Sequence, residues 1–175
     1  MSTGLPATGT RRTARRKEIL TAAIGIVSAE GCDALTMRRV AEELGMRAPS
    51  LYKHLRDKDE LIAALQEHAL TSVAVALESV PGDLASIAAA YRSWALANPA
   101  LYELASGRPL ARDRIDADVE ARAAAPIVAA ASGDEDKARM LWAAAHGLVD
   151  LELHGRFPPE ADLDAAWAVL VRAFS

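Results

Sequence analysis

The segment from residue 36 to residue 60, TMRRVAEELGMRAPSLYKHLRDKDE, constrains most strongly how this chain can fold. It predicts two short helices joined by a tight turn, followed directly by the start of a third. Ala41 is small enough for the second helix to cross over it. Gly45 lies at the turn, where a left-handed backbone costs a residue without Cβ least. The segment is therefore predicted to form a helix-turn-helix, whose second helix can lie in the major groove of DNA. Its apolar wedge would consist of Val40, Leu44, Met46, Leu51 and Leu55.

Helical periodicity without alternating strand patterns predicts an all-α fold for the rest of the chain. The 175 residues are 51% apolar, enough for a real core. We expect a disordered N-terminal arm at 1–12, a helix-turn-helix DNA-binding domain at 13–60, and a C-terminal regulatory, ligand-binding and dimerisation domain at 61–175. The expected helices cover about 13–30, 36–44, 48–55, 58–80, 83–97, 99–105, 113–131, 135–154 and 162–174.

Charge is distributed unevenly along the chain. The overall net charge is −4, but residues 1–60 contain 11 Lys and Arg against 8 Asp and Glu, a net charge of +3. Residues 61–175 contain 9 against 16, a net charge of −7. This asymmetry indicates a cationic head and an acidic body with different partners.

Cysteine content and hydropathy predict a cytoplasmic protein without a membrane partner. The single cysteine, Cys32, fits a reducing cytosol. The longest apolar runs fall short of the ~20 residues that a membrane span needs, and the N-terminus lacks the apolar stretch of a signal peptide.

Two sets of residues resemble a known family. The C-terminal set is Trp142-Ala-Ala-Ala-His146-Gly147, supported by Tyr91 and by Asn98-Pro99-Ala100-Leu101-Tyr102. The N-terminal set lies within about residues 13–65 and comprises Ile19-Leu20, Ala22-Ala23, Gly31, Leu35-Thr36-Met37, Val40-Ala41, Leu44-Gly45, Leu51-Tyr52, His54, Leu55, Lys58 and Leu61. This head resembles the tetracycline-repressor (TetR) family of bacterial regulators, and the body resembles its WHG-type C-terminal domain. The resemblance implies a homodimeric, ligand-responsive transcriptional regulator that binds a double-stranded DNA operator.

The predicted DNA contacts lie in or beside the helix at 48–55. Donors near its N-terminus can contact base edges, and apolar groups can touch thymine methyl groups. The candidates are Arg47, Ala48, Pro49, Ser50, Lys53 and His54. Arg47, which precedes the helix, could contact either a guanine or a phosphate, and Ser50 and Lys53 could also bond to either. The family resemblance makes Tyr52 and His54 backbone clamps and places Lys58, at a helix N-terminus, and Thr36 against phosphates.

Several of these positions have a structural alternative. Tyr52 and His54 could instead pack within the head, and Thr36 is a helix cap in either case. Arg38 and Arg39 are expected to form a solvated face. The N-terminal arginines could either reach DNA as an arm or simply be exposed.

The body is expected to hold a small organic effector between its helices, as the family does. The candidate lining is Tyr91, Trp94, Tyr102, Trp142, His146 and Asp150. The last three are spaced by four residues and so share one helical face. A Trp or a His on an inward face can equally be a core residue.

Dimerisation should use the last two helices, where apolar residues recur at helical spacing, although some of them must fill the chain's own core. These residues are Leu141, Ala144, Ala145, Leu148, Leu151, Val169, Leu170 and Ala173.

Neither a catalytic constellation nor a cofactor motif is evident. A metal site at His146, Asp150 and His154 is disfavoured, because one imidazole would have to reach past the other. We therefore expect no enzyme activity and no cofactor. The alternative hypothesis is a helical small-molecule carrier or an enzyme whose DNA-binding head is vestigial.

Overall fold

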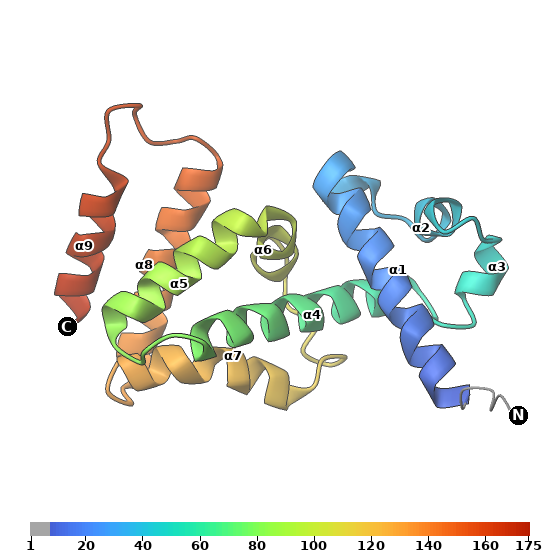
Figure 1. The fold of residues 1–175 in the computed structure, drawn as a ribbon, viewed down its shortest axis with the longest axis horizontal. Helices are drawn as coiled ribbons and strands as arrows, with labels where there is room; N and C mark the ends of the chain where they lie inside the picture. The colour runs from blue at the N-terminus through green and yellow to red at the C-terminus, as the bar shows by residue number, and fades with distance from the viewer. Residues whose placement is uncertain (1–7) are drawn as a thin grey trace, which may run out of the picture.

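The computed structural model describes residues 8–175, and all regular structure in this range is helical, so the all-α prediction is confirmed. A helical head holds α1, α2 and α3, and a helical body holds α5 to α9 (Figure 1). Helix α4 runs from head to body, and α3 and α9 lie at opposite ends of the molecule (Figure 1). The elements are α1 (Thr8–Glu30), the 3-10 helix η1 (Cys32–Ala34), α2 (Met37–Glu43), α3 (Ala48–Leu51), α4 (Lys58–Glu78), α5 (Leu84–Ala97), α6 (Pro99–Ser106), α7 (Ala117–Ala130), α8 (Glu135–Leu153) and α9 (Leu163–Phe174).

Three helix boundaries differ from expectation. Helix α1 begins at Thr8, earlier than the expected start at about residue 13, while residues 1–7 of the expected arm lie outside the described residues. Helix α3 ends at Leu51 because the next turn tightens, with the His54 N–H donating to the Leu51 carbonyl at 2.9 Å. Helix α7 begins only at Ala117, after the Asp116 side chain caps it.

Short polar side chains cap the start of five further helices, α2, α4, α5, α8 and α9. Each accepts a hydrogen bond from a backbone N–H of the first turn, which otherwise has no partner within the helix. The donor is three residues further along the chain, at 2.7 to 3.0 Å. These caps are Thr36, Asp57, Asp83, Asp134 and Asp162.

Helix α4 is the central element of the core. Its buried side chains recur every four residues and pack against α1 in the head and against α5, α6 and α7 in the body. By length and composition α4 alone, among residues 8–175, could cross a membrane, but half of its apolar window is buried inside the protein. Packing of this kind is typical of a core helix. The side chains in this row are Leu61, Leu65, Ala69, Val73 and Leu77.

One polar side chain is completely buried in this core. Gln66 of α4 has no exposed surface, and its Nε2 donates to the carbonyls of Leu104 at 3.2 Å and Pro109 at 3.1 Å. Its Oε1 accepts from the Ala111 N–H at 3.0 Å. All three partners belong to the end of α6 or to the segment 107–116. Because this segment is not helical, the Gln66 amide satisfies backbone groups that helix hydrogen bonds leave free.

We predict that Gln66→Leu lowers the free energy of unfolding by about 1–3 kcal/mol. The substitution keeps the side-chain volume but leaves buried backbone groups without partners. Urea denaturation followed by circular dichroism measures the change. The control is His68→Leu, an exposed position of the same helix, which should change stability by less than about 0.5 kcal/mol. Equal stability of the two variants would contradict the role assigned to Gln66.

Candidate nucleic-acid interface and ligand pocket

The turn between α2 and α3 has the geometry that its sequence predicts. Gly45 has φ +61°, in the left-handed region that favours glycine. The Gly45 N–H donates to the Glu42 carbonyl at 3.0 Å, and the Met46 N–H donates to the Ala41 carbonyl at 2.8 Å. This pair of bonds is a Schellman motif. Of the wedge residues, Val40, Leu51 and Leu55 are fully buried, and Leu44 and Met46 are partly buried.

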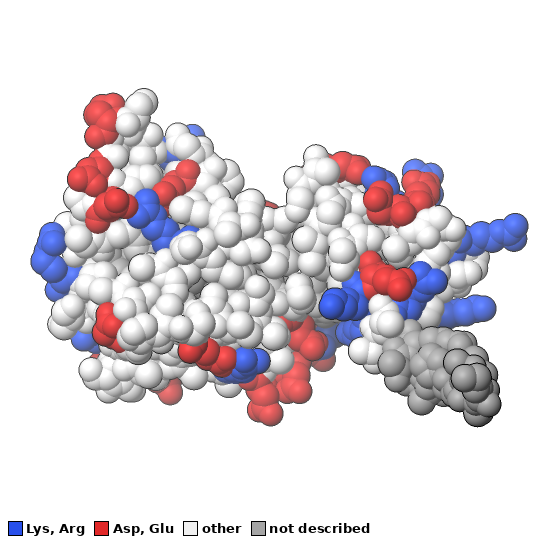
Figure 2. Space-filling view, in the orientation of Figure 1, with Lys and Arg blue, Asp and Glu red and all other residues white. Residues whose placement is uncertain are grey.

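The locked turn leaves one face of α3 and its flanks in solvent. Arg47, Pro49, Tyr52 and Lys53 are exposed, and 51% of Tyr52 is accessible. Tyr52 therefore does not pack inside the head, which was its structural alternative. In Figure 2 Lys and Arg side chains stand out from the end of the molecule that carries α2 and α3. The remaining candidates Ala48, Ser50, His54 and Lys58 are partly buried, and Thr36 is exposed.

Thr36 has a structural role, and His54 is partly buried. The Thr36 hydroxyl caps α2 by accepting from the Arg39 N–H at 3.0 Å. The Nδ1 atom of His54 is buried and is the one such side-chain atom in the described part of the chain without a hydrogen-bond partner. One edge of this imidazole is thus turned into the protein.

The two arginines of α2 differ in their surroundings. Arg39 donates to Glu30 of α1 at 2.6 and 3.0 Å and to Glu43 at 2.8 Å, and these hydrogen bonds raise its pKa. Arg39 therefore ties α2 to α1. The sequence had suggested a solvated residue at this position. Arg38 is exposed and lies 3.5 Å from Glu42.

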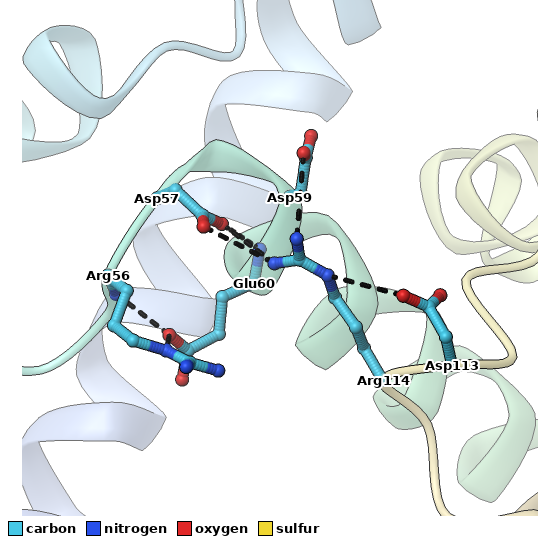
Figure 3. Close-up of polar contacts among 6 residues, drawn as sticks. All are labelled: Arg56, Asp57, Asp59, Glu60, Asp113 and Arg114. Atoms are coloured by element: carbon cyan, nitrogen blue, oxygen red, sulfur yellow. Dashed lines mark hydrogen bonds and ion pairs between the residues drawn. The ribbon is translucent and has the colours of Figure 1, made fainter.

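The start of α4 lies where head and body meet. The Asp57 carboxylate caps α4 by accepting from the Glu60 N–H at 2.7 Å. This bond holds the pKa of Asp57 below its ordinary value, and the contact with Arg114 contributes to a smaller extent. Glu60 in turn accepts from the Arg56 N–H at 2.8 Å and from Arg56 Nε at 3.1 Å. Figure 3 shows Arg56, Asp57 and Glu60 at this helix start. Lys58 is the first residue of the helix.

The body contains an apolar pocket between α5, α7 and α8. It is partly open to solvent. Two of the six candidate residues, Tyr91 and Trp142, line it, and 47% of Trp142 is exposed. The sequence did not identify the other lining residues, because aliphatic residues and alanines at helical spacing have the same pattern whether they line a pocket or fill a core. These residues are Leu84, Ile87, Ala88, Ile127, Leu141 and Ala145.

The remaining four candidates do not line this pocket. Trp94 is buried and donates from Nε1 to the Ser72 hydroxyl at 2.9 Å. Tyr102 is buried, its OH lies 2.6 Å from His146 Nδ1, and burial with the nearby Asp150 charge raises its pKa to about 12.

The His146 ring connects these groups to the pocket. It stacks on Trp142 with ring centroids 5.6 Å apart. The fourth candidate, Asp150, instead lies 3.4 Å from His154 Nδ1. Within the described residues, no three His, Cys, Asp or Glu side chains are grouped to hold a metal ion.

Helices α8 and α9 carry exposed apolar side chains on the end of the body. Met140 is 62% exposed, Val169 56% and Leu151 41%. Leu141 and Leu170, which the sequence placed on the same stripes, are buried in the chain's own core.

Comparison with known proteins gives these features a family. Residues 19–65 match the model of bacterial regulatory proteins of the tetR family, and residues 84–174 match the tetracyclin repressor-like C-terminal domain. An uncharacterized HTH-type transcriptional regulator of Mycobacterium tuberculosis is 31% identical over 170 residues, which cover 89% of this chain and 78% of the relative.

Solved structures give the same result. The regulatory protein SCO4313 superposes with a TM-score of 0.81 at 28% identity, covering 95% of this chain and 97% of that one. The multidrug binding protein EbrR, complexed with imidazole, superposes with a TM-score of 0.69 at 27% identity, covering 92% and 95%.

A helix-turn-helix head joined by one long helix to a helical body with a pocket defines a ligand-responsive DNA-binding regulator. The chain belongs to the TetR family of bacterial transcriptional regulators. Members of this family bind DNA and small-molecule effectors and typically dimerise.

We predict that Gly45→Ala destabilises the head by about 1–2 kcal/mol, because an L-residue in the left-handed region is strained. Gly25→Ala is the matched control: Gly25 is an exposed interior residue of α1, with no atom within 4 Å of an added Cβ. It should stabilise the protein by up to about 1 kcal/mol. Thermal unfolding measures both changes, and a neutral Gly45→Ala would contradict the assigned turn geometry.

Proposed function

We propose that this chain is a homodimeric repressor that binds a palindromic operator and is released from it by a small organic effector. The observation that carries the proposal is the solvent-facing surface of α3 on a locked turn, connected through α4 to a body with an apolar pocket. The protein would act on the bacterial chromosome and hence in the cytoplasm.

In the complex α3 enters the major groove and its flanks bind the backbone. Arg47 is suited to a guanine, since its fork can donate to both O6 and N7. Ala48 and Pro49 offer apolar contact to thymine methyl groups, and Ser50 and Lys53 can donate hydrogen bonds. Tyr52, His54, Lys58 and Thr36 contact phosphates, which position the head without selecting sequence.

Dimerisation doubles this surface so that two heads meet successive turns of DNA. The exposed apolar side chains Met140, Leu151 and Val169 of α8 and α9 form the contact between copies. Arg92 of α5 supports this face, because it pairs with Glu152 of α8 at 2.8 Å and Asp164 of α9 at 2.6 Å. These ion pairs hold the two helices together.

The effector acts through the pocket between α5, α7 and α8. An apolar or aromatic molecule suits its lining, with Tyr91 and Trp142 as aromatic contacts. Helix α4 packs on both α5 and α7. A ligand that favours a different arrangement of these helices therefore shifts α4 and the head it carries, which changes the spacing of the two heads.

The alternative of a carrier or enzyme with a vestigial head is less well supported. Its head would have no reason to keep the left-handed glycine, the buried wedge and the exposed basic surface together. Whether the regulator represses or activates depends on the position of its operator.

A gel shift on the promoter region flanking its own gene tests the proposal. The effector-free dimer should give a specific shift. Lys58→Ala should weaken binding to every DNA sequence. It should also reduce the slope of log binding constant against log salt concentration by about 1 for each phosphate that the protein no longer neutralises. The control Lys137→Ala removes a body lysine at the start of α8 and should leave both unchanged. A folded dimer without any specific shift would refute operator binding.

The effector site is tested by filling it. Small apolar aromatic compounds that bind the folded protein raise its melting temperature in proportion to RT ln(1 + [L]/Kd). Ala88→Phe places a ring in the pocket and should abolish this rise while operator binding persists. Ala89→Phe, on the exposed side of α5, serves as the control. If Ala88→Phe retains the full response, the effector binds elsewhere.

A further inference from the structure

We propose that Arg114, a residue of the body, is a positioning residue for DNA binding that neutralises Asp57 and Asp59 at the start of α4. A body conformation that withdraws Arg114 would then expose two carboxylates to the phosphate backbone. The inference rests on the proposed function and adds an electrostatic component to effector-induced release.

The contact joins two parts of the chain that are far apart in sequence. Arg114 Nη1 lies 3.0 and 3.3 Å from the two carboxylate oxygens of Asp57, and Nη2 lies 3.9 Å from Asp59. Its Nε lies 3.8 Å from Asp113, a neighbour on the body side. Figure 3 shows the guanidinium between the α4 carboxylates and Asp113.

The charges around Lys58 explain why this contact matters. Asp57 and Asp59 flank Lys58 directly, and Arg56 is occupied by Glu60. The Asp57–Lys58–Asp59 group alone has a net charge of −1, and Arg114 brings these three residues to zero, while Asp113 adds one negative charge on the body side of the guanidinium. A helix N-terminus attracts phosphate through its free N–H groups. Uncompensated carboxylates at the same place oppose that attraction.

The segment that carries Arg114 is also connected to the pocket. Residues 107–116 are anchored to α4 by the Gln66 hydrogen bonds, and they end at Asp116, the cap of α7. Ile127 of α7 lines the pocket. A shift of α7 relative to α4 acts on this segment through Asp116, and a shift that breaks the Gln66 hydrogen bonds would separate Arg114 from Asp57.

Arg112 provides a matched comparison within the same segment. It pairs with Glu120 of α7 through Nε at 3.0 Å and Nη2 at 2.8 Å. Both partners belong to the body, so this ion pair does not reach α4. Replacing Arg112 makes the same change in net charge without altering the charges beside Lys58.

The test is a double-mutant cycle in DNA affinity. The probes are two fluorescent duplexes, one from the protein's own promoter region and one of scrambled sequence, measured by anisotropy. At about 0.1 M salt Arg114→Gln should weaken binding to both by about fivefold per head, and this effect should shrink as salt is raised. In the Asp57→Asn/Asp59→Asn background, Arg114→Gln should weaken DNA binding by less than about twofold. Asn still caps α4, so the background keeps the helix start.

Two further variants separate charge from structure. Arg114→Lys keeps the charge and should retain most of the affinity, although it lacks the planar fork. Arg112→Gln should leave the affinity nearly unchanged. If Arg112→Gln weakened binding as much as Arg114→Gln does, only total charge would matter and the inference would be overturned.

The outcomes distinguish this inference from the proposed function. A wild-type protein that binds neither duplex overturns both. If the wild type binds but Arg114→Gln lowers the DNA affinity by the same factor with and without the two carboxylates, only the role of Arg114 is overturned.

Discussion

Burial of α4 on two sides is the interaction on which the rest of the structure depends. The same row of side chains packs against α1 in the head and against α5, α6 and α7 in the body. A helix held at both ends cannot tilt in one part without moving the other, because close-packed interiors transmit displacement. The position of the head is thus coupled to the packing around the pocket. A flexible linker between head and body would lack this coupling.

Polar contacts determine which segment of the body is connected to α4. Gln66 ties α4 to the segment 107–116, and Arg114 of that segment reaches back to Asp57 at the helix start. The apolar row fixes where α4 lies, while these contacts fix which body segment lies beside its N-terminal end. Exposed ion pairs contribute little to stability. Their importance here lies in where they place charge.

The head was largely predictable because its determinants are local. Thr36 caps α2 and Gly45 adopts the left-handed turn, and both effects involve residues only a few positions apart. The body was less predictable. Nothing in the residue pattern distinguishes Ile127 as a pocket residue, or Trp94 as the donor to Ser72. An apolar residue at helical spacing has the same pattern whether it meets a neighbouring helix or an empty space.

Short stretches of sequence are enough to specify the all-α class, the helix starts and the helix-turn-helix, since each follows from intrinsic backbone geometry and capping chemistry. Which partners distant residues meet is settled by tertiary packing instead. Arg39 pairs with Glu30, Arg114 pairs with Asp57, and Met140 is left in solvent while Leu141 is buried. These outcomes depend on how helices cross in space, and crossing is set by the packing of the whole core.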